Sequence, residues 1–505
     1  MPLNTSLEKN LREIERVSGS SADMVIRRFK IAGKTGAAVV YIDGIINDTT
    51  VGEMLHTLMV ESLRDRELRG MKLTVENLLD SLVAVDDIQE TDSLAGLFNS
   101  ISTGNTGLLI DGQKVALLCE TKGKTSRAVE MPITEATIRG PRDGFTEELR
   151  VNTSLVRHRI RVPHLWFEKF EIGKLTQTNV EMAYIKGLVS DKLLQEVRSR
   201  LERIDTDSIL ESGYIEEFIM DNPYTVFPLV LRTERPDKVA AALLEGRVAL
   251  FCQGSPFVLL LPMEIFMMLQ APEDYYEFFP IGTLVRFVRT VSLVISLLLP
   301  GLYVAIINFH PELLPTALLL RITAAREGIP LPLVLEIFLL EFLFEILREA
   351  GLRLPQPIGS AVSIVGALIL GDAAIRAGIV SPAVVVVIAL TAIASFSTPA
   401  FSLAIAMRIL RFAFIGLGSI MGLLGIQFGV FVLIVHLCSL RSFGVPYLSP
   451  LAPFIWEDMK DNFIRLWWWK QRTRPRFTGQ RQRVRLESEL EPGPYRKGDP
   501  EGGQK

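Results

Sequence analysis

Three glutamates interrupt one of the most apolar stretches of the chain. Glu336, Glu341 and Glu345 lie within residues 331–347, among thirteen Leu, Ile, Val and Phe side chains. Those apolar side chains favour membrane insertion by roughly 4–8 kcal/mol, whereas each centrally placed acid costs about 2.5–3.5 kcal/mol. The sum is near zero or unfavourable, so we do not predict a lone lipid-exposed span. The segment lies at the interface, or packs against other helices or a water-filled cavity with its acids inward. The alternative is an amphipathic helix that faces water.

Small side chains recur every four residues in a second apolar segment, at Gly359, Ser363, Ala367 and Gly371. Such a stripe lets two helix backbones approach closely, and helix–helix packing is its simplest interpretation. The functional alternative is a pore-lining face in an oligomer, where small and hydroxylated side chains leave room for hydrated ions. The candidate pore-lining residues are Val362, Ser363, Gly366 and Ala367.

Residue types that carry out catalysis or hold cofactors are not grouped in this sequence. The three cysteines, Cys119, Cys252 and Cys438, are far apart, and the five histidines form no HExxH or similar metal pattern. Nothing in the sequence pairs a nucleophile with a base. We therefore predict a protein that is not an enzyme, with no catalytic residue, no cofactor and no metal site.

Two Gly-Lys-Thr tripeptides, at Gly33 and Gly123, look like the end of a phosphate-binding loop. That loop needs a second glycine about five residues earlier, so that backbone amides can wrap the phosphates. Arg28 and Leu118 occupy those positions, so both tripeptides are predicted to be ordinary turns.

Basic side chains gather in two places. Residues 157–164 hold three arginines and two histidines, which we interpret as a solvated helix face. Residues 470–485 hold seven basic side chains and no acid, directly after three tryptophans at 467–469. Aromatic residues followed by cations are typical of an interfacial membrane anchor that meets anionic headgroups, with RNA contact as the alternative. The net charge of −3 argues against a nucleic-acid footprint over the whole protein.

The composition indicates that part of the chain lies in lipid. The 505 residues are 49% hydrophobic and 22% charged, and their mean hydropathy is +0.30. Spanning about 30 Å of hydrocarbon takes roughly 20 apolar residues. We predict four spans, at residues 290–309, 358–378, 382–407 and 412–436. Within the second, Asp372 and Arg376 lie four residues apart and can pair near the interface.

Arginines and lysines beside these runs predict the orientation. Arg286 and Arg289 precede the first run, and the basic tail follows the last. With both ends on the cytoplasmic side the number of spans is even, which agrees with four. Arg408 and Arg411 would then fall in a short outer loop, which counts against this orientation. Residues 1–20 are polar and lack a signal peptide, so we expect the soluble part to stay in the cytoplasm.

The first 270 residues contain an internal repeat. Residues 41–48 (YIDGIIND) match residues 184–191 (YIKGLVSD) at an offset of 143, and residues 104–118 match residues 246–260 at an offset of 142. The second pair of segments is typical of a β-hairpin with a Gly turn. Two matches at nearly the same spacing predict two duplicated α/β subdomains. The alternative is one large domain with fortuitous similarity.

These patterns predict an α/β soluble region of two duplicated subdomains, followed by an all-α polytopic membrane domain. The soluble region comprises an N-terminal tail at 1–36, a first subdomain at 37–140, a helical linker at 141–175 and a second subdomain at 176–280. The membrane domain, about four spans plus the acidic segment, covers 281–453. A basic, partly disordered cytoplasmic tail occupies 454–505.

Several longer stretches together carry a family resemblance. They are residues 139–147 (RGPRDGFTE), 227–228, 233–238 (TERPDK), 255–262 (SPFVLLLP), 272–276 (PEDYY), 314–318 (LPTAL), 347–355 (LREAGLRLP) and 442–450 (SFGVPYLSP). In this order they resemble the GerA family, the A subunits of the nutrient germinant receptors of endospore-forming bacteria. The similarity covers about residues 33–453.

The resemblance implies a cytoplasmic two-part domain followed by a multi-pass membrane domain in the inner membrane of the dormant spore. It implies a permease-like B subunit that holds the nutrient and a lipoprotein C subunit as partners, with membrane lipid but no nucleic acid. It further implies a homo-oligomer, a pentamer, that forms a nutrient-gated cation channel. Residues 359–371 then become the candidate pore helix. No chemistry of individual residues is carried over.

Three other functions remain open at this point. A paralogue within the family would act with the dipicolinic-acid channel proteins to amplify germination. A secondary transporter would use Glu336, Glu341 and Glu345 as coupling sites, although the membrane half shows no inverted repeat and few spans. A scaffold would use its soluble domains only to gather partners.

Overall fold

The structure is a computed structural model that describes residues 2–31, 33–61, 87–123, 131–132, 134–135, 137–353, 369–479 and 481–486. The chain forms two compact units. An α/β unit contains residues 1–221, 230–262 and 467–505, and a helical unit contains residues 222–229 and 263–466. We describe each unit by itself.

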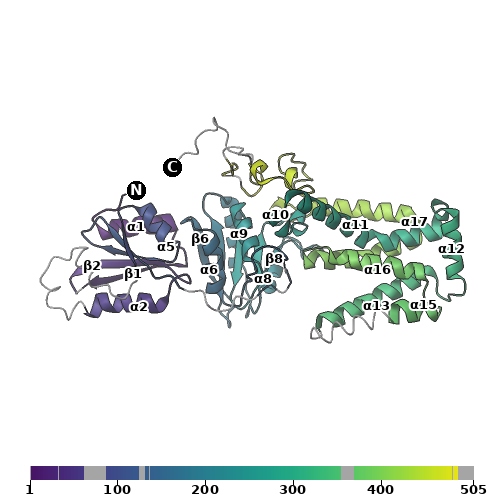
Figure 1. Cartoon of the computed structure of the whole chain (residues 1–505), viewed down its shortest axis with the longest axis horizontal. Coiled ribbons are helices and arrows are strands. Elements are labelled where there is room, and N and C mark those ends of the chain that lie inside the picture. Colours follow the sequence, from purple (N-terminus) through teal and green to yellow (C-terminus); the bar gives the residue numbers. More distant parts are fainter. Residues whose placement is uncertain are drawn as a thin grey trace. The chain divides into compact units, whose positions relative to one another are not determined.

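The first half of the α/β unit is a five-stranded antiparallel sheet with helices on both faces (Figure 1). Its strands, β1 (Met24–Ile31), β2 (Thr35–Ile42), β3 (Ile88–Thr91), β4 (Thr106–Ile110) and β5 (Ala116–Cys119), stand in the order β1-β2-β4-β5-β3. In β2, Ala37 and Val39 enter the core under α2 (Asp48–His56), which continues into the π-helical turn η1 (Thr57–Glu61). Ala38 and Val40 enter the core under α1 (Leu7–Ser18) and α5 (Leu94–Ile101). Successive side chains of a strand point to opposite faces, so one apolar strand supplies both cores.

The second half repeats this topology. Strands β6 (Leu165–Ile172), β7 (Thr178–Ile185), β8 (Leu231–Thr233), β9 (Val248–Cys252) and β10 (Val258–Leu261) stand in the order β6-β7-β9-β10-β8. Helices α7 (Asp191–Glu202), α8 (Ser212–Ile219) and α9 (Pro236–Leu244) accompany them. Tyr41 and Tyr184, which head the sequence repeat, lie in the equivalent strands β2 and β7. The predicted duplication of an α/β fold is confirmed.

Each sheet begins earlier than the sequence boundaries suggested. Strand β1 lies within residues 1–36, which we expected to be a tail, and β6 lies within the expected linker at 141–175. Both are edge strands whose exposed positions carry charged side chains, such as Arg27, Arg28 and Glu171. Charge on an edge strand discourages further pairing and also weakens the apolar pattern that reveals a strand. The linker does contain a helix, α6 (Leu149–Arg159).

The basic segment on α6 is not a solvated face. Arg157 is buried and grips the buried Asp23, with Nε 2.9 Å from Oδ2 and Nη2 3.0 Å from Oδ1. Arg159 pairs with Asp143 and is only partly exposed. Our interpretation as a solvated helix face was wrong for Arg157, because Asp23 is 134 residues away in sequence and only folding brings it to α6. Arg161 and His164 are exposed but lie beyond the end of α6.

The basic tail also packs on the second subdomain. Arg474 Nε donates to the Leu244 carbonyl at 2.8 Å, and Arg481 pairs with Asp191. Thr478 is fully buried, and a Cβ added to Gly246 would lie 2.7 Å from its carbonyl oxygen. Residues 467–479 and 481–486 therefore belong to the folded α/β unit.

The helical unit is built mainly on α11 (Phe279–Phe309), which contacts α16 (Pro382–Phe396) and α17 (Phe401–Ser439). Its further helices are α10 (Glu273–Tyr276), α12 (Thr316–Arg326), α13 (Leu333–Arg353) and α15 (Ala374–Arg376), with a two-stranded ribbon of β11 (Arg441–Ser442) and β12 (Val445–Pro446). Figure 1 shows these helices in green and teal. Within the described residues, two helices are long and apolar enough to cross a membrane, α11 and α17, and α16 is shorter.

Helix α17 is a hairpin of two arms. Gly422 has φ 62° and ψ −141°, which breaks the helix. A Cβ on Gly425 would lie 2.3 Å from the Leu417 carbonyl oxygen, although a straight helix separates residues eight apart by about 12 Å. The chain therefore folds back at Gly422, with small residues where the arms meet.

Helix boundaries differ from the predicted spans. The run at 382–407 breaks between α16 and α17, where Pro399 disfavours helical geometry in the residue before it. The run at 412–436 is divided at Gly422. Part of the run at 358–378 lies outside the described residues.

Candidate functional site

The three glutamates of α13 each meet an arginine inside the helical unit. Glu336 is fully buried, and its Oε1 accepts hydrogen bonds from the backbone N–H of Ser381 and, at 2.6 Å, from the Ser381 hydroxyl. Ser381 is the N-cap of α16, where a carboxylate complements the positive end of the helix. Arg326 of α12 lies 3.8 Å from Glu336 Oε2. Glu336 thus joins three helices.

Glu341 forms the most enclosed pair. Arg411 of α17 donates from Nη1 to Glu341 Oε2 at 2.8 Å, and the two side chains are 2% and 3% exposed. Arg411 Nε also donates to the Ser296 carbonyl of α11 at 2.6 Å. One guanidinium therefore holds α13, α17 and α11 together. Removing one partner of such a pair leaves an uncompensated buried charge, which costs about 3–5 kcal/mol.

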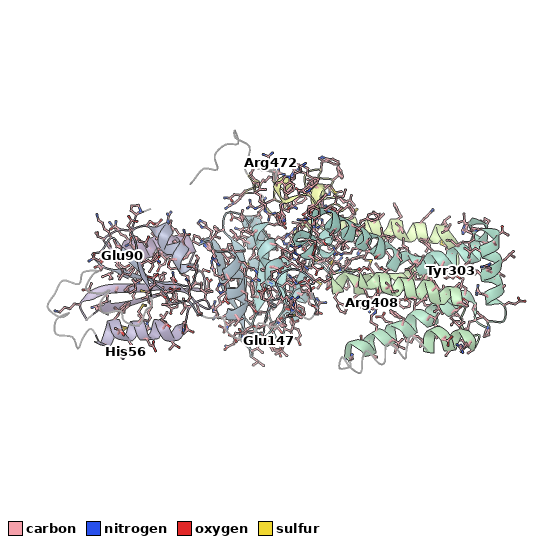
Figure 2. The ribbon with its side chains drawn as sticks, viewed as in Figure 1. His56, Glu90, Glu147, Tyr303, Arg408 and Arg472 are labelled. Atoms are coloured by element: carbon pink, nitrogen blue, oxygen red, sulfur yellow. The ribbon has the colours of Figure 1, made fainter. Side chains whose placement is uncertain are left out.

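The third pair is more open. Glu345 pairs with Arg408, which is labelled in Figure 2, and Glu345 is 39% exposed. Nearby, Arg348 donates to the Ser395 hydroxyl at 2.8 Å and stacks on Phe344 and Phe396 with ring-centre distances of 5.0 and 4.9 Å. From Glu336 to Glu345 the acids form a line of ion pairs along α13, which we call the α13 ladder (Glu336, Glu341 and Glu345 with Arg326, Arg411 and Arg408).

The acids turn inward against other helices, as one of the sequence alternatives expected. Sequence reasoning missed their partners, because Arg408 and Arg411 were placed in an outer loop, whereas both lie inside the first arm of α17. Opposite charges in two apolar helices were a usable signal. A single unpaired charge is energetically unfavourable in an apolar environment, so pairing between the acids of one helix and the arginines of the other could have been expected.

The arginines that guided the orientation are paired as well. Arg286 and Arg289 are buried at the start of α11, and both bind the buried Asp274, at 3.2 Å and 2.9 Å respectively. Arg286 also reaches Asp461, whose carboxylate accepts from the Tyr275 hydroxyl at 2.6 Å. These two cations are structural, so they are weak evidence for orientation.

The remaining residues that the sequence singled out are the pore-lining candidates and the cysteines. Val362, Ser363, Gly366 and Ala367 lie outside the described residues. Burial raises the pKa of the Cys119 and Cys252 thiols to about 12, so both are protonated and unreactive at neutral pH. Across the described part of the chain, no three His, Cys, Asp or Glu side chains are grouped to hold a metal ion.

Among the described residues of the α/β unit, Glu181 has a strongly perturbed carboxyl group. Glu181 of β7 is 1% exposed, and burial raises its pKa to about 7, although Arg150 opposes this shift from 3.1 Å. The nearby Asp23 and Asp43 carboxylates raise it further. Arg150 also binds Asp43 at 3.1 Å and donates to the Ala22 carbonyl at 3.2 Å. It therefore ties the first subdomain to the second.

The fold defines a class of protein in which a duplicated α/β region accompanies apolar helices joined by buried ion pairs. The sequence profile of the Bacillus/Clostridium GerA spore germination proteins matches residues 12–477. The chain belongs to this family.

Relatives cover nearly the whole chain. Spore germination protein KA of Bacillus subtilis is 45% identical over 97% of this chain and 90% of its own length. Spore germination protein GerLA of Bacillus cereus is 38% identical over 92% of this chain and 94% of its own length. The crystal structure of the N-terminal domain of the A subunit of the Bacillus megaterium germinant receptor GerK3 is 35% identical, with a TM-score of 0.41, over 52% of this chain and 96% of that one.

Proposed function

We propose that this chain is the A subunit of a spore nutrient germinant receptor and that it oligomerises, as a pentamer, into a cation channel that nutrient binding opens. The observation that carries the proposal is the family match over residues 12–477, which includes the α/β unit and the apolar helices alike. The partners are then a permease-like B subunit, a lipoprotein C subunit and membrane lipid.

The proposed location is the inner spore membrane, crossed several times, with the α/β unit in the cytoplasm. Helices α11 and α17 support it by length and composition. The chain leaves the α/β unit at residue 262 and returns to it at residue 467. Because both connections reach the same unit, the number of crossings between them is even.

The α13 ladder favours a channel subunit over a transporter that moves substrate itself. A coupling carboxylate must exchange its proton or cation during each cycle. Glu336 and Glu341 instead hold helices together through buried hydrogen bonds and ion pairs. We therefore assign the ladder a positioning role and keep Val362, Ser363, Gly366 and Ala367 as the pore-lining proposal.

The test is potassium release from spores with and without this chain, for a panel of amino acids and sugars. Loss of release for one nutrient class supports the receptor subunit and identifies its ligand class. Uniformly slower release with every nutrient supports the amplifying paralogue instead.

Substitutions in the proposed pore refine this test. Ser363→Phe or Gly366→Phe narrows a pore lined by small side chains, so ion release changes while assembly is unaffected. Ile420→Phe, at an exposed position of α17, is the matched control. Normal assembly with normal flux in both pore variants would remove residues 359–371 from the pore.

A further inference from the structure

The helical unit contains a groove that the α13 ladder does not use. It runs between the two arms of α17, and residues 224–227, which we call the strap, line its end beside His436. The groove has a volume of about 360 Å³, within the range of small-ligand sites. All its walls belong to the helical unit.

Apolar side chains form almost the whole lining. The first arm contributes one helix face, and the second arm contributes residues one turn apart. The lining residues on the arms are Leu410, Ala413, Phe414, Leu417, Phe428, Gly429, Val432, Leu433 and His436. None of the described residues that line the groove is an acid, a lysine or an arginine, so it offers no counter-charge to an ion or an amino-acid zwitterion.

The groove has a single polar end. There the Thr225 hydroxyl and His436 Nε2 are joined by a hydrogen bond of 3.0 Å. Phe227 of the strap is buried and packs its ring on that of His436, with 6.0 Å between the ring centres. His436 stands one turn before the end of α17, where the apolar run stops. The polar pair thus marks the edge of the apolar zone.

The dimensions fit one leaflet of a bilayer. Residues 428 and 436 are eight apart, which makes the groove about 12 Å long at 1.5 Å per residue. One leaflet contributes about 15 Å to a hydrocarbon core of about 30 Å. The groove therefore spans most of one leaflet and ends at the level where headgroups begin.

The surroundings of the groove are also apolar. Beside it, Phe431 and Val435 on the second arm and Ile409 on the first are more than half exposed. A surface of this kind is stable only against hydrocarbon or another apolar surface. Because the groove opens onto this apolar surface, the hydrocarbon chains of the surrounding lipid are its simplest occupant.

We propose that this groove binds one acyl chain of a membrane phospholipid, with the ester region of the lipid hydrogen-bonded at Thr225 and His436. This inference rests on the membrane location given under the proposed function. A lipid held in this way joins the two arms of α17 to the strap.

The experiment uses the full chain reconstituted in phosphatidylglycerol vesicles that include a phospholipid with a diazirine in one acyl chain. After irradiation, mass spectrometry locates the labelled residues. We expect each groove wall residue to be labelled more strongly than the outer positions Phe431 and Val435, which meet only exchanging bulk lipid.

Ala413→Phe is the test variant, because Ala413 lines the groove and is exposed, so a ring can enter the groove without disturbing the core. Displacing several methylene contacts lowers groove labelling about tenfold. Ile409→Phe, on the same arm but outside the groove, leaves labelling unchanged. Elution of each variant in size-exclusion chromatography confirms that it is folded.

Five results would overturn the inference. Groove label that persists in Ala413→Phe, or label spread evenly over groove and outer faces, refutes a bound acyl chain. Cross-links between groove residues and a second copy of the chain would show that the groove is occupied by protein and not by lipid. Absence of label from every helix refutes the membrane location as well, whereas label confined to outer faces refutes only the groove.

Discussion

Replacing Arg411 by methionine isolates the most enclosed charge pair of the α13 ladder. The substitution keeps a long apolar side chain but removes the 2.8 Å bond to Glu341 and the 2.6 Å bond to the Ser296 carbonyl. Glu341, 3% exposed, then carries an unpaired buried charge. From this geometry we expect the variant to lose about 3–5 kcal/mol of stability.

The double variant Glu341→Gln/Arg411→Met separates the effect of an unpaired charge on stability from the effect of altered side-chain packing. A buried pair replaced by neutral groups of similar shape is close to neutral in stability, since both desolvation costs vanish with the attraction. We therefore expect the double variant to recover most of the stability that Arg411→Met loses. The non-additivity of the two substitutions measures their coupling.

The assay is thermal unfolding of the purified full chain in detergent. The measured quantity is the fraction of protein that remains monodisperse at each temperature. For a unit of this size the single variant lowers the midpoint by roughly 10 °C. Arg376→Met is the matched control, because Arg376 pairs with Asp372 at 2.8 Å on the surface, where such pairs contribute at most about 1 kcal/mol. The reasoning is refuted if Arg411→Met is as stable as Arg376→Met, or if the double variant is less stable than both single variants.

Three further predictions concern the α/β unit. Because burial raises the folded pKa of Glu181 to about 7 from 4.5, the stability contributed by its protonated form is complete below pH 4.5 and is lost as pH rises through 7, about 3 kcal/mol in all. The protection factors of the β7 amides, which are corrected for the pH dependence of intrinsic exchange, should therefore fall between these pH values, and Glu181→Gln should flatten this profile; an unchanged slope in the variant would contradict this. Asp23→Ala leaves Arg157 buried and unpaired, so α6 should lose about 3–5 kcal/mol of protection against hydrogen exchange, whereas Asp205→Ala, in an exposed pair with Lys174, should lose almost none. Gly246→Ala places a Cβ 2.7 Å from the Thr478 carbonyl oxygen and should release the basic tail to trypsin, whereas Gly112→Ala, at a similar positive φ with open space around it, should not; equal cleavage of the two would refute the docking.

The fold was largely predictable where the sequence repeats itself. The Gly turns after Tyr41 and Tyr184 and the two hairpins are local features, and each returns at nearly the same spacing. A duplicated segment folds alike because the same short-range pattern of strands and turns is present twice. The edge strands β1 and β6 were not predicted, because their charged residues obscure the alternation of apolar and polar side chains that indicates a strand.

The helices were predictable in kind but not in extent. Hydropathy identified the apolar runs, yet Pro399 and Gly422 decided where they break. A window average of hydropathy gives little weight to one residue, whereas backbone geometry depends on it.

By itself, the sequence determined the α/β repeat, the apolar helical half and the membership in a spore germination family. Only the tertiary structure decided which charges neutralise each other. Arg157 finds Asp23 and Arg411 finds Glu341 across 134 and 70 residues of chain. The free-energy cost of burying a charge depends on the side chain itself, so the sequence alone indicates that a buried charge needs a partner. Which residue becomes that partner depends on how elements distant in the sequence pack together. Positions that looked like a solvated helix face or an outer loop are therefore buried contacts.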